Sequence, residues 1–339
     1  MRLKHLLDKS LRHAAAGALV LAVAGSAAAA AQTPEHVKFN LSWLPQGSTV
    51  GVIVAQDNGL YAKAGLDVEI VRGYGGIRTT NEIDQGLWEF GYGNPIGVVL
   101  NRAKDGHTLM IGAVNDKWPG GLCYVEGKHS IKTPADLQGL TVGGGQYSPV
   151  QVMLGPWLEG NGVDPKAVKL IQLDPAVVDA SLIEGRIDLA ECWPGSNYEL
   201  LEKRAKEANV KLGLLEYSKF KLDIYGSGIV TSETVVKQKP DMVRRFVTAT
   251  YAGYEWSFKH PEEATAVMLK VYPVLDHDVT LEQIKNTDTL MQGADTAKHG
   301  LGWMSEQRMK NTLDFVVKAY DVKVPIKVDD LYTNEFLKK

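Results

Sequence analysis

The chain has 339 residues, of which 45% are hydrophobic and 23% are charged, and its formal net charge is −3. These values are typical of a globular protein long enough for two ordinary domains. A mildly acidic chain without a basic run lacks the composition of proteins that bind nucleic acid or anionic membranes, so we expect neither partner.

The N-terminus has the pattern of a secretory signal. Four basic residues are followed by an apolar run over residues 14–25 and by small residues up to Ala31. The run is shorter than the roughly 18–20 residues that span a bilayer, which favours a cleaved signal over residues 1–31 rather than an uncleaved anchor. The mature chain would then have 308 residues (339 minus 31). No cysteine ends the signal to carry a lipid, so we expect a free protein in the periplasm.

Strand and helix patterns alternate along the rest of the chain, which predicts an α/β fold. In the first third, the pattern predicts a helix over 50–58, ended by Gly59, and strands over 37–41, 66–71, 89–92 and 109–114. No segment with the composition of a flexible linker interrupts this pattern, so we expect short strands to join the domains.

Two segments in the middle of the chain have the sequence pattern of a helix N-terminus. Thr133-Pro134-Ala-Asp136 combines an N-cap hydroxyl, proline at the first helical position and an acid at the third. Ser148-Pro149 repeats this device after the glycines of residues 143–145. A strand, a glycine turn and a capped helix together offer free backbone N–H groups to a ligand. An ordinary tight turn and cap is the alternative interpretation.

Further along, residues 181–194 read as a helix end, a glycine cap and a strand over 187–190. That strand would deliver Glu191, Cys192 and Trp193 at its carboxyl end, where open parallel sheets bind ligands. A long amphipathic helix over 240–258 follows, and His260-Pro261 ends it and starts another. Its predicted core stripe consists of Val243, Phe246, Val247 and Tyr254.

The two cysteines, Cys123 and Cys192, could pair in an oxidising compartment. The sequence does not show whether they meet, and we favour the interpretation of buried, unpaired cysteines. No H-E-x-x-H, G-x-S-x-G, Walker or G-x-G-x-x-G motif occurs. Asp276-His277-Asp278 is interpreted as a solvated loop rather than a metal site. We therefore expect no catalytic residues, no metal and no cofactor.

Aromatic and polar side chains follow several predicted strands. Trp43 follows the first strand, Tyr92 and Asn94 follow another, and Trp118 lies in a Pro-Gly-Gly turn. Aromatic residues at such tips can stack on a flat ring. Each could equally be a core or surface aromatic, but as a set they favour a mostly apolar, planar ligand.

A series of segments runs from Leu41-Ser-Trp-Leu-Pro and residues 51–70 through residues 132–143, 182–188, 239–246 and 260–264 to Gly300-Leu-Gly-Trp-Met-Ser. Together these segments resemble the periplasmic solute-binding family that includes thiamine-precursor and alkanesulfonate binders. The resemblance covers nearly the whole mature chain, and the order of the segments makes it specific.

The resemblance implies a type II periplasmic binding protein, with two α/β lobes that each contain a mixed sheet flanked by helices. Residues 36–124 and 228–339 would form one lobe and residues 125–227 the other. The two crossing hinge strands would lie near residues 122–125 and 227–230. It also implies a monomer that captures a small molecule in the cleft and delivers it to the permease and ATPase subunits of an ABC importer.

The resemblance also assigns roles to residues of the cleft. Trp43 matches the aromatic that stacks on a pyrimidine, and Glu191 matches the acid that accepts from a ring amino group. Gly144, Gln146, Tyr147 and Ser148 match a glycine-rich ligand loop. The remaining predicted ligand-binding residues are Tyr92, Asn94, Trp118, Trp193 and Tyr225.

The same superfamily contains a fungal enzyme that makes the thiamine pyrimidine from its own histidine. Its cysteine-rich run would fall at residues 223–228, which hold no cysteine, and its reactive lysine and histidine would fall near Gly93 and Gly97. We therefore expect a binding protein for a planar, thiamine-precursor-like pyrimidine. The alternatives are a binder of a sulfonate or aromatic acid and, less favoured, a periplasmic enzyme or a sensor partner.

Overall fold

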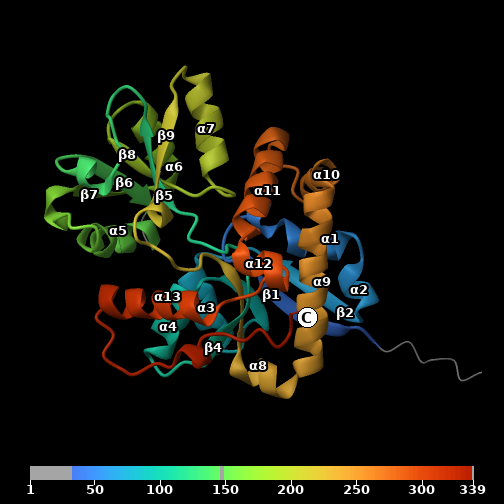
Figure 1. Ribbon diagram of the computed structural model, residues 1–339. Helices are drawn as coiled ribbons and strands as arrows, with labels where there is room; N and C mark the ends of the chain where they lie inside the picture. The colour runs from blue at the N-terminus through green and yellow to red at the C-terminus, as the bar shows by residue number, and fades with distance from the viewer. Residues whose placement is uncertain (1–32, 146–148, 338–339) are drawn as a thin grey trace, which may run out of the picture. The chain divides into compact units, whose positions relative to one another are not determined.

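The structure is a computed structural model that describes residues 33–145 and 149–337. It contains two five-stranded sheets with helices packed around them (Figure 1). We call residues 35–113 and 228–337 lobe 1, residues 121–216 lobe 2, and residues 114–120 and 217–227 the crossing segments. The helices in the described residues are too short or too polar to cross a membrane.

The sheet of lobe 1 has the strand order β2-β1-β3-β10-β4, in which β10 is antiparallel to both of its neighbours. The strands are β1 (Glu35–Asn40), β2 (Leu66–Val71), β3 (Phe90–Gly93), β4 (Thr108–Ala113) and β10 (Gly228–Ser232). Each of the four predicted strands of this lobe is present, within one or two residues at either end. Apolar side chains on β1 and β3 are buried because helices cover the sheet.

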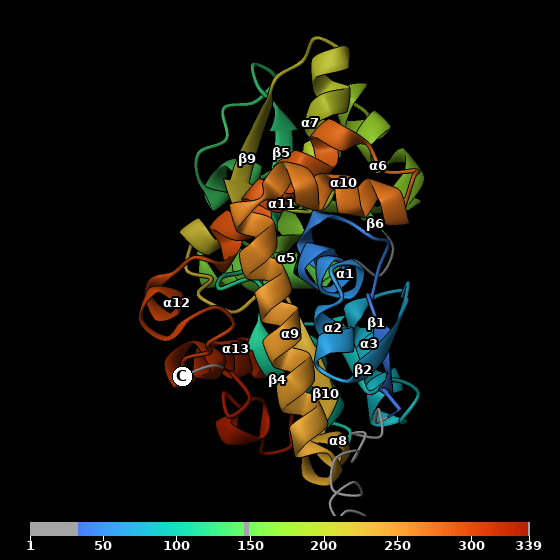
Figure 2. The same cartoon turned by 90° about the vertical axis from the view of Figure 1, so that its right-hand side faces the viewer.

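The helices of lobe 1 come from both ends of the chain. They are α1 (Val50–Asp57), α2 (Leu60–Lys63), α3 (Gly76–Asp84), α4 (Pro95–Arg102), α8 (Glu233–Gln238), α9 (Pro240–Lys259), α10 (Pro261–Val271), α11 (His277–Met291), α12 (Ala294–His299) and α13 (Glu306–Ala319), with the 3₁₀ turns η1 (Gly47–Thr49) and η5 (Val328–Asp330). Figure 2 shows α9 running the length of the lobe beside α1 and α2.

The predicted core stripe of α9 is confirmed, since all four of its residues are buried. The ring of Phe246 stacks on Phe90 at 4.1 Å and on Tyr61 at 5.3 Å between ring centroids. Two glycines let α9 approach α1 closely, because a Cβ on Gly253 would lie 2.1 Å from the carbonyl oxygen of Gly51. This helix is therefore the main support of the lobe 1 sheet.

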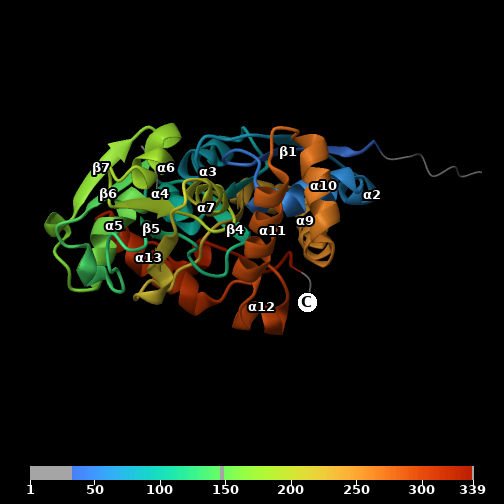
Figure 3. The same ribbon diagram turned by 90° about the horizontal axis from the view of Figure 1, so that it is seen from above.

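The sheet of lobe 2 has the order β7-β6-β8-β5-β9, in which β5 is antiparallel to both of its neighbours. Its elements are β5 (Gly121–Val125), η2 (Pro134–Leu137), β6 (Thr141–Gly145), α5 (Pro149–Gly160), η3 (Pro165–Ala167), β7 (Lys169–Leu173), α6 (Pro175–Ile183), β8 (Leu189–Cys192), α7 (Tyr198–Glu207) and β9 (Leu212–Glu216). Seen from above (Figure 3), β6, β7, α5 and α6 lie on one side, α9 and α10 lie on the other, and α11 lies between them.

The two sheets have equivalent topologies. In each, the strand that directly follows a crossing segment is inserted as the antiparallel fourth strand, β10 in lobe 1 and β5 in lobe 2. The crossing segments are hydrogen-bonded to each other, since the backbone N–H groups of Val114 and Asn115 both donate to the Ser227 carbonyl, at 2.8 and 2.9 Å. The expected architecture, two mixed sheets flanked by helices and joined by two crossings, is confirmed.

Several sequence-based expectations need correction. Residues 121–124 were expected in lobe 1, but they pair with β8 and β9 in lobe 2, so the first crossing ends at Gly120. The strand expected over 187–190 is β8, Leu189–Cys192, because its neighbours β5 and β6 pair with it only from Leu189 onward.

Two further corrections concern single motifs. The Thr133–Asp136 capping box is present, but the helix that it starts is one 3₁₀ turn. The expected loop at Asp276-His277-Asp278 is instead the start of α11, where the Asp276 side chain accepts from the Val279 N–H and caps the helix.

Candidate functional site

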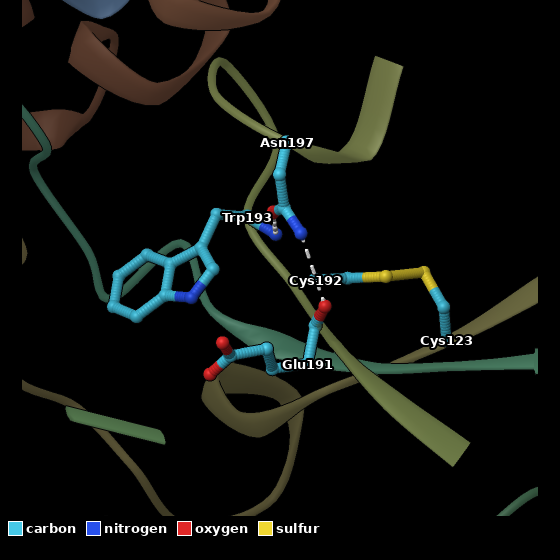
Figure 4. Close-up of a disulfide and its surroundings, with 5 residues drawn as sticks. All are labelled: Cys123, Glu191, Cys192, Trp193 and Asn197. Atoms are coloured by element: carbon cyan, nitrogen blue, oxygen red, sulfur yellow. Dashed lines mark hydrogen bonds between the residues drawn. A yellow bond between two sulfur atoms is a disulfide. The ribbon is translucent and has the colours of Figure 1, made fainter. Parts of the chain in front are cut away.

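The tip of β8 and the loop that follows it form the best-defined part of the candidate site. The Asn197 side chain closes this loop, since it accepts from the Trp193 N–H at 2.7 Å and donates to the Glu191 carbonyl at 3.2 Å. Figure 4 shows the Glu191 carboxylate and the Trp193 indole on one side of β8, with the side chain of Cys192 on the other. This alternation follows from the pleat of a strand.

A disulfide joins Cys123 of β5 to Cys192 of β8, with a Cα–Cα distance of 5.7 Å. The favoured interpretation of unpaired cysteines is therefore wrong. Cys123 pairs with Ala190 in the sheet register, so the two cysteines are diagonal neighbours on one face of adjacent strands. The local sequence could not reveal this pairing, because 69 residues separate the cysteines. The disulfide fixes β8 immediately behind Glu191 and Trp193.

Two tryptophans lie against each other beside this tip. The ring centroids of Trp118 and Trp193 are 5.0 Å apart at an interplanar angle of 59°. Trp118 belongs to the first crossing segment and is buried, and its Nε1 has no hydrogen-bond partner among the described residues. The predicted pair Trp118 and Trp193 is thus brought together at the boundary between lobe 2 and the crossing.

Tyr217 is a further residue of this region that sequence reasoning missed. It lies at the start of the second crossing segment, and its ring packs 4.4 Å from that of Trp157. Burial raises the pKa of its hydroxyl, and the negative charge of Glu191 raises it further. The hydroxyl has no partner among the described residues. No sequence signal relates Tyr217 to this region, because its position depends on how β9 returns to the crossing.

The predicted lobe 1 residues lie at the carboxyl ends of β1 and β3. Trp43 is 45% exposed, and its carbonyl accepts from the N–H of Gly73 at 3.3 Å, which ties the loop after β1 to the loop after β2. Tyr92 is buried next to Ser48 and Ser227, and burial raises the pKa of its hydroxyl. The Asn94 side chain accepts from the Gly97 N–H and so caps α4. Asn94 therefore has a structural role in this conformation.

Tyr225 is directed toward α13. Its hydroxyl accepts from the Ser305 N–H at 2.6 Å, and the guanidinium of Arg308 lies 5.3 Å from the ring centroid. Gly144 is a buried residue of β6. Gln146, Tyr147 and Ser148 lie outside the described residues.

A pocket of about 350 Å³ lies between the lobes next to the two tryptophans. Its volume falls within the range of small-molecule sites. From the predicted set it includes Trp118. Its other lining residues are Lys117, Pro119, Pro194, Tyr198, Leu214, Glu216, Lys219, Asn286, Thr289 and Leu290. No cluster of His, Cys, Asp or Glu suited to a metal ion occurs in the part of the chain that the structure describes.

The equivalent sheets, the inserted antiparallel strands and the double crossing define the fold of a type II periplasmic binding protein. The aliphatic sulphonate-binding protein SsuA of Escherichia coli has a similar structure, with a TM-score of 0.66 and 16% sequence identity. The alignment covers 90% of this chain and 100% of SsuA. At this identity, the similarity establishes the fold alone.

The NMT1/THI5-like family model matches residues 46–264, which is more than half of the chain. The chain therefore belongs to the NMT1/THI5-like family. The formylaminopyrimidine-binding protein of Halalkalibacterium halodurans is 26% identical over 240 residues, covering 69% of this chain and 70% of that protein. The riboflavin-binding protein RibY of Chloroflexus aurantiacus is 25% identical over 316 residues, covering 90% of this chain and 87% of RibY. Family and fold together support a substrate-binding role.

Proposed function

We propose that this protein is the substrate-binding component of an ABC importer and that it captures a small planar heterocycle, such as a thiamine-precursor-like pyrimidine, between its lobes. The observation that carries the proposal is the tip of β8, where a carboxylate and an indole lie on the same side of the strand and a second indole packs against the first. Aromatic faces with a few polar groups are typical of sites for planar ligands.

Each group has a distinct role in this proposal. Trp43 stacks on the ring, which contributes about 0.5–1.5 kcal/mol beyond the burial of its surface. Glu191 accepts a hydrogen bond from an amino or ring N–H, and such charge-assisted bonds contribute about 1.5–3 kcal/mol. Two relatives, whose names state binding of a formylaminopyrimidine and of riboflavin, support a planar nitrogen heterocycle.

The setting of this function is also part of the proposal. The pattern of the first 31 residues supports export and cleavage, with the mature monomer acting in the periplasm. The permease and ATPase subunits of the importer would be its partners, since the fold is shared with periplasmic binding proteins. The relatives named as binding proteins support a role without catalysis.

A thermal-shift screen of the mature protein tests the proposal. Ligands would be aminopyrimidines, purines, riboflavin, alkanesulfonates and aromatic acids. A ligand at about 100 times its dissociation constant stabilises the folded state by roughly 2.7 kcal/mol, which raises the melting temperature by several degrees. We expect the shift with aminopyrimidines or riboflavin. A shift with sulfonates or aromatic acids alone would overturn the assigned roles of Trp43 and Glu191.

An anionic ligand is the second candidate, because the fold is also that of a sulphonate-binding protein. The carboxylate of Glu191 argues against it, since a like charge close to a sulfonate is destabilising unless one of the two is neutralised. Turnover of a bound ligand, or specific association with a receptor ectodomain, would instead support an enzyme or a sensor partner.

A further inference from the structure

The loop that follows β8, beginning with Trp193, continues into a set of contacts with lobe 1. Figure 1 shows α11 of lobe 1 beside α7 of lobe 2, and the loop between β8 and α7 reaches this junction. We call residues 194–199 the latch loop. None of its residues belongs to the predicted ligand set, so its contacts need a separate explanation.

Gln283 of α11 bridges the two lobes with both ends of its side-chain amide. Its Oε1 accepts from the Gly47 N–H of lobe 1 at 2.9 Å, and its Nε2 donates to the Ser196 carbonyl of the latch loop. The residue is buried. A Cβ on Gly47 would lie 2.3 Å from the Gln283 Cβ, so η1 lies directly against α11. The bridge is thus held in a close-packed environment.

Glu199 makes a second bridge one turn along α11. Its Oε1 accepts from the Gly195 N–H at 2.7 Å and from the Asn286 Nδ2 of lobe 1 at 2.6 Å. Glu199 is only 4% exposed, and its Oε2 has no partner among the described residues. Burial raises the pKa of Glu199, the charge of Glu202, three residues along α7, raises it further, and α11 presents the neutral amide of Asn286. A buried carboxylate with these partners is costly to separate from Asn286.

Two hydrogen bonds to η1 complete the junction. The Ser48 N–H donates to the Gly195 carbonyl at 3.2 Å, and the Ser196 hydroxyl donates to the Gln46 side chain at 2.7 Å. Gly195 has a φ of +80° and lies against Thr287 of α11, so the backbone conformation and the close approach both favour glycine there. Lobe 2 is therefore joined to lobe 1 through the same loop that presents the ligand-binding side chains.

We propose that Gln283, Asn286 and Glu199 are positioning residues of the binding site, which hold the latch loop against lobe 1 and so set the population of the closed state. The predicted effect on affinity rests on the proposed function, whereas the predicted effect on the distance between the lobes does not. The apparent dissociation constant equals the intrinsic one divided by the fraction of protein in the binding-competent state. Loss of the latch would then weaken binding although Glu191 and Trp193 are intact.

The test measures the distance between the lobes without any ligand, by pulsed EPR between spin labels at the exposed positions Lys104 and Lys166. We expect Gln283→Ala to broaden the distribution toward longer distances. Asn286→Asp, which keeps the side-chain size, should do the same at pH 8, because two carboxylates then face each other. When the pH is lowered until the pair shares a proton, the shorter distance should return.

Lys285→Ala is the matched control. Lys285 lies on α11 between Gln283 and Asn286, but its side chain is half exposed and forms an ion pair with Glu282 of the same helix. We expect it to leave the distances unchanged. Circular dichroism of each variant confirms folding, and Gln283→Glu replaces Gln283→Ala if the latter does not fold. Wild-type distances in both Gln283→Ala and Asn286→Asp would overturn the proposal, as would a change of equal size in Lys285→Ala.

Affinity provides the second measurement, with 4-amino-2-methylpyrimidine and riboflavin as probes. We expect about tenfold weaker binding in Gln283→Ala at unchanged stoichiometry. If neither probe binds the wild-type protein, the proposed ligand class is wrong. The distance measurement still shows whether the latch residues hold the two lobes together. If the probes bind and the variants bind equally well, the latch does not control affinity and the positioning role is wrong.

Discussion

Lobe 1 is built around the 20-residue helix α9 and a stack of aromatic rings, whereas lobe 2 has no described helix longer than the 12 residues of α5 and joins two of its strands by a disulfide. Both lobes nevertheless have the same strand order, with an antiparallel fourth strand. The comparison shows that one topology can be stabilised either by an extensive apolar core or by a smaller core with a covalent link. In lobe 2 the link lies directly behind the candidate ligand residues, so stability and binding are coupled there.

The largest expected effect is on ligand binding, to which each lobe contributes one side chain in the proposed site. Replacing Trp43 of lobe 1 and Glu191 of lobe 2 together by Ala should abolish detectable binding. Loss of one stacking contact and one charge-assisted hydrogen bond costs about 2–4 kcal/mol, or roughly 30-fold to 1,000-fold in affinity. Calorimetric titration with the ligand from the thermal-shift screen measures the effect. Unchanged affinity would remove both residues from the site.

The next largest effect tests the aromatic core of lobe 1. Phe246→Ala should destabilise the protein by about 3–5 kcal/mol, because it leaves a cavity among three stacked rings. Thermal unfolding followed by circular dichroism should show a melting temperature roughly 8–15 °C lower. Val274→Ala, at a fully solvated position of the same lobe, is the control. Similar melting temperatures for both variants would contradict the role assigned to α9.

The disulfide of lobe 2 is the counterpart of that core. Replacing Cys123 and Cys192 by Ser should destabilise the protein by about 2–4 kcal/mol, since the link closes a loop of 69 residues in the unfolded chain. Because β8 then loses its attachment behind Glu191, we also expect weaker ligand binding. Denaturant unfolding and titration measure the two effects. Loss of stability with wild-type affinity would show that the sheet alone positions Glu191.

The smallest effect is a pH dependence at the junction of the lobes. Burial raises the pKa of Glu199 above its ordinary value of 4.5, so the folded protein retains this proton at a higher pH than the unfolded chain does. The contribution of Glu199 to stability is therefore fully present below pH 4.5 and is lost as the pH rises through its folded pKa. Relative to wild type, Glu199→Gln should become progressively more favourable from pH 4.5 to pH 8.

Urea unfolding of both proteins across this pH range measures the difference. The comparison with wild type isolates Glu199, because Asp116 and Asp179, whose pKa values are also raised, remain in both proteins. Parallel stability profiles for the wild-type and Glu199→Gln proteins would contradict the assigned environment of Glu199.

Much of the fold followed from local patterns. The strand over 66–71, the core stripe of α9 and the capping box at Thr133 depend on residues within a few positions of one another, so the sequence shows them directly. Predicted boundaries were least accurate where sheet pairing decides them. At β8, the partners β5 and β6 set the start of the strand, and neither can be read from the residues of β8 itself.

The sequence by itself determined the α/β class, the order of the elements and, through a family resemblance, the two-lobe architecture. Periodicity, caps and glycine turns are short-range properties of the chain, which is why they are legible without a structure. Only the tertiary structure decided that Cys123 meets Cys192 and that Gln283 holds the latch loop. These two contacts join residues that are 69 and 87 positions apart. They form only because two separate sheets and their crossings fold back on each other, and no local preference encodes that closure.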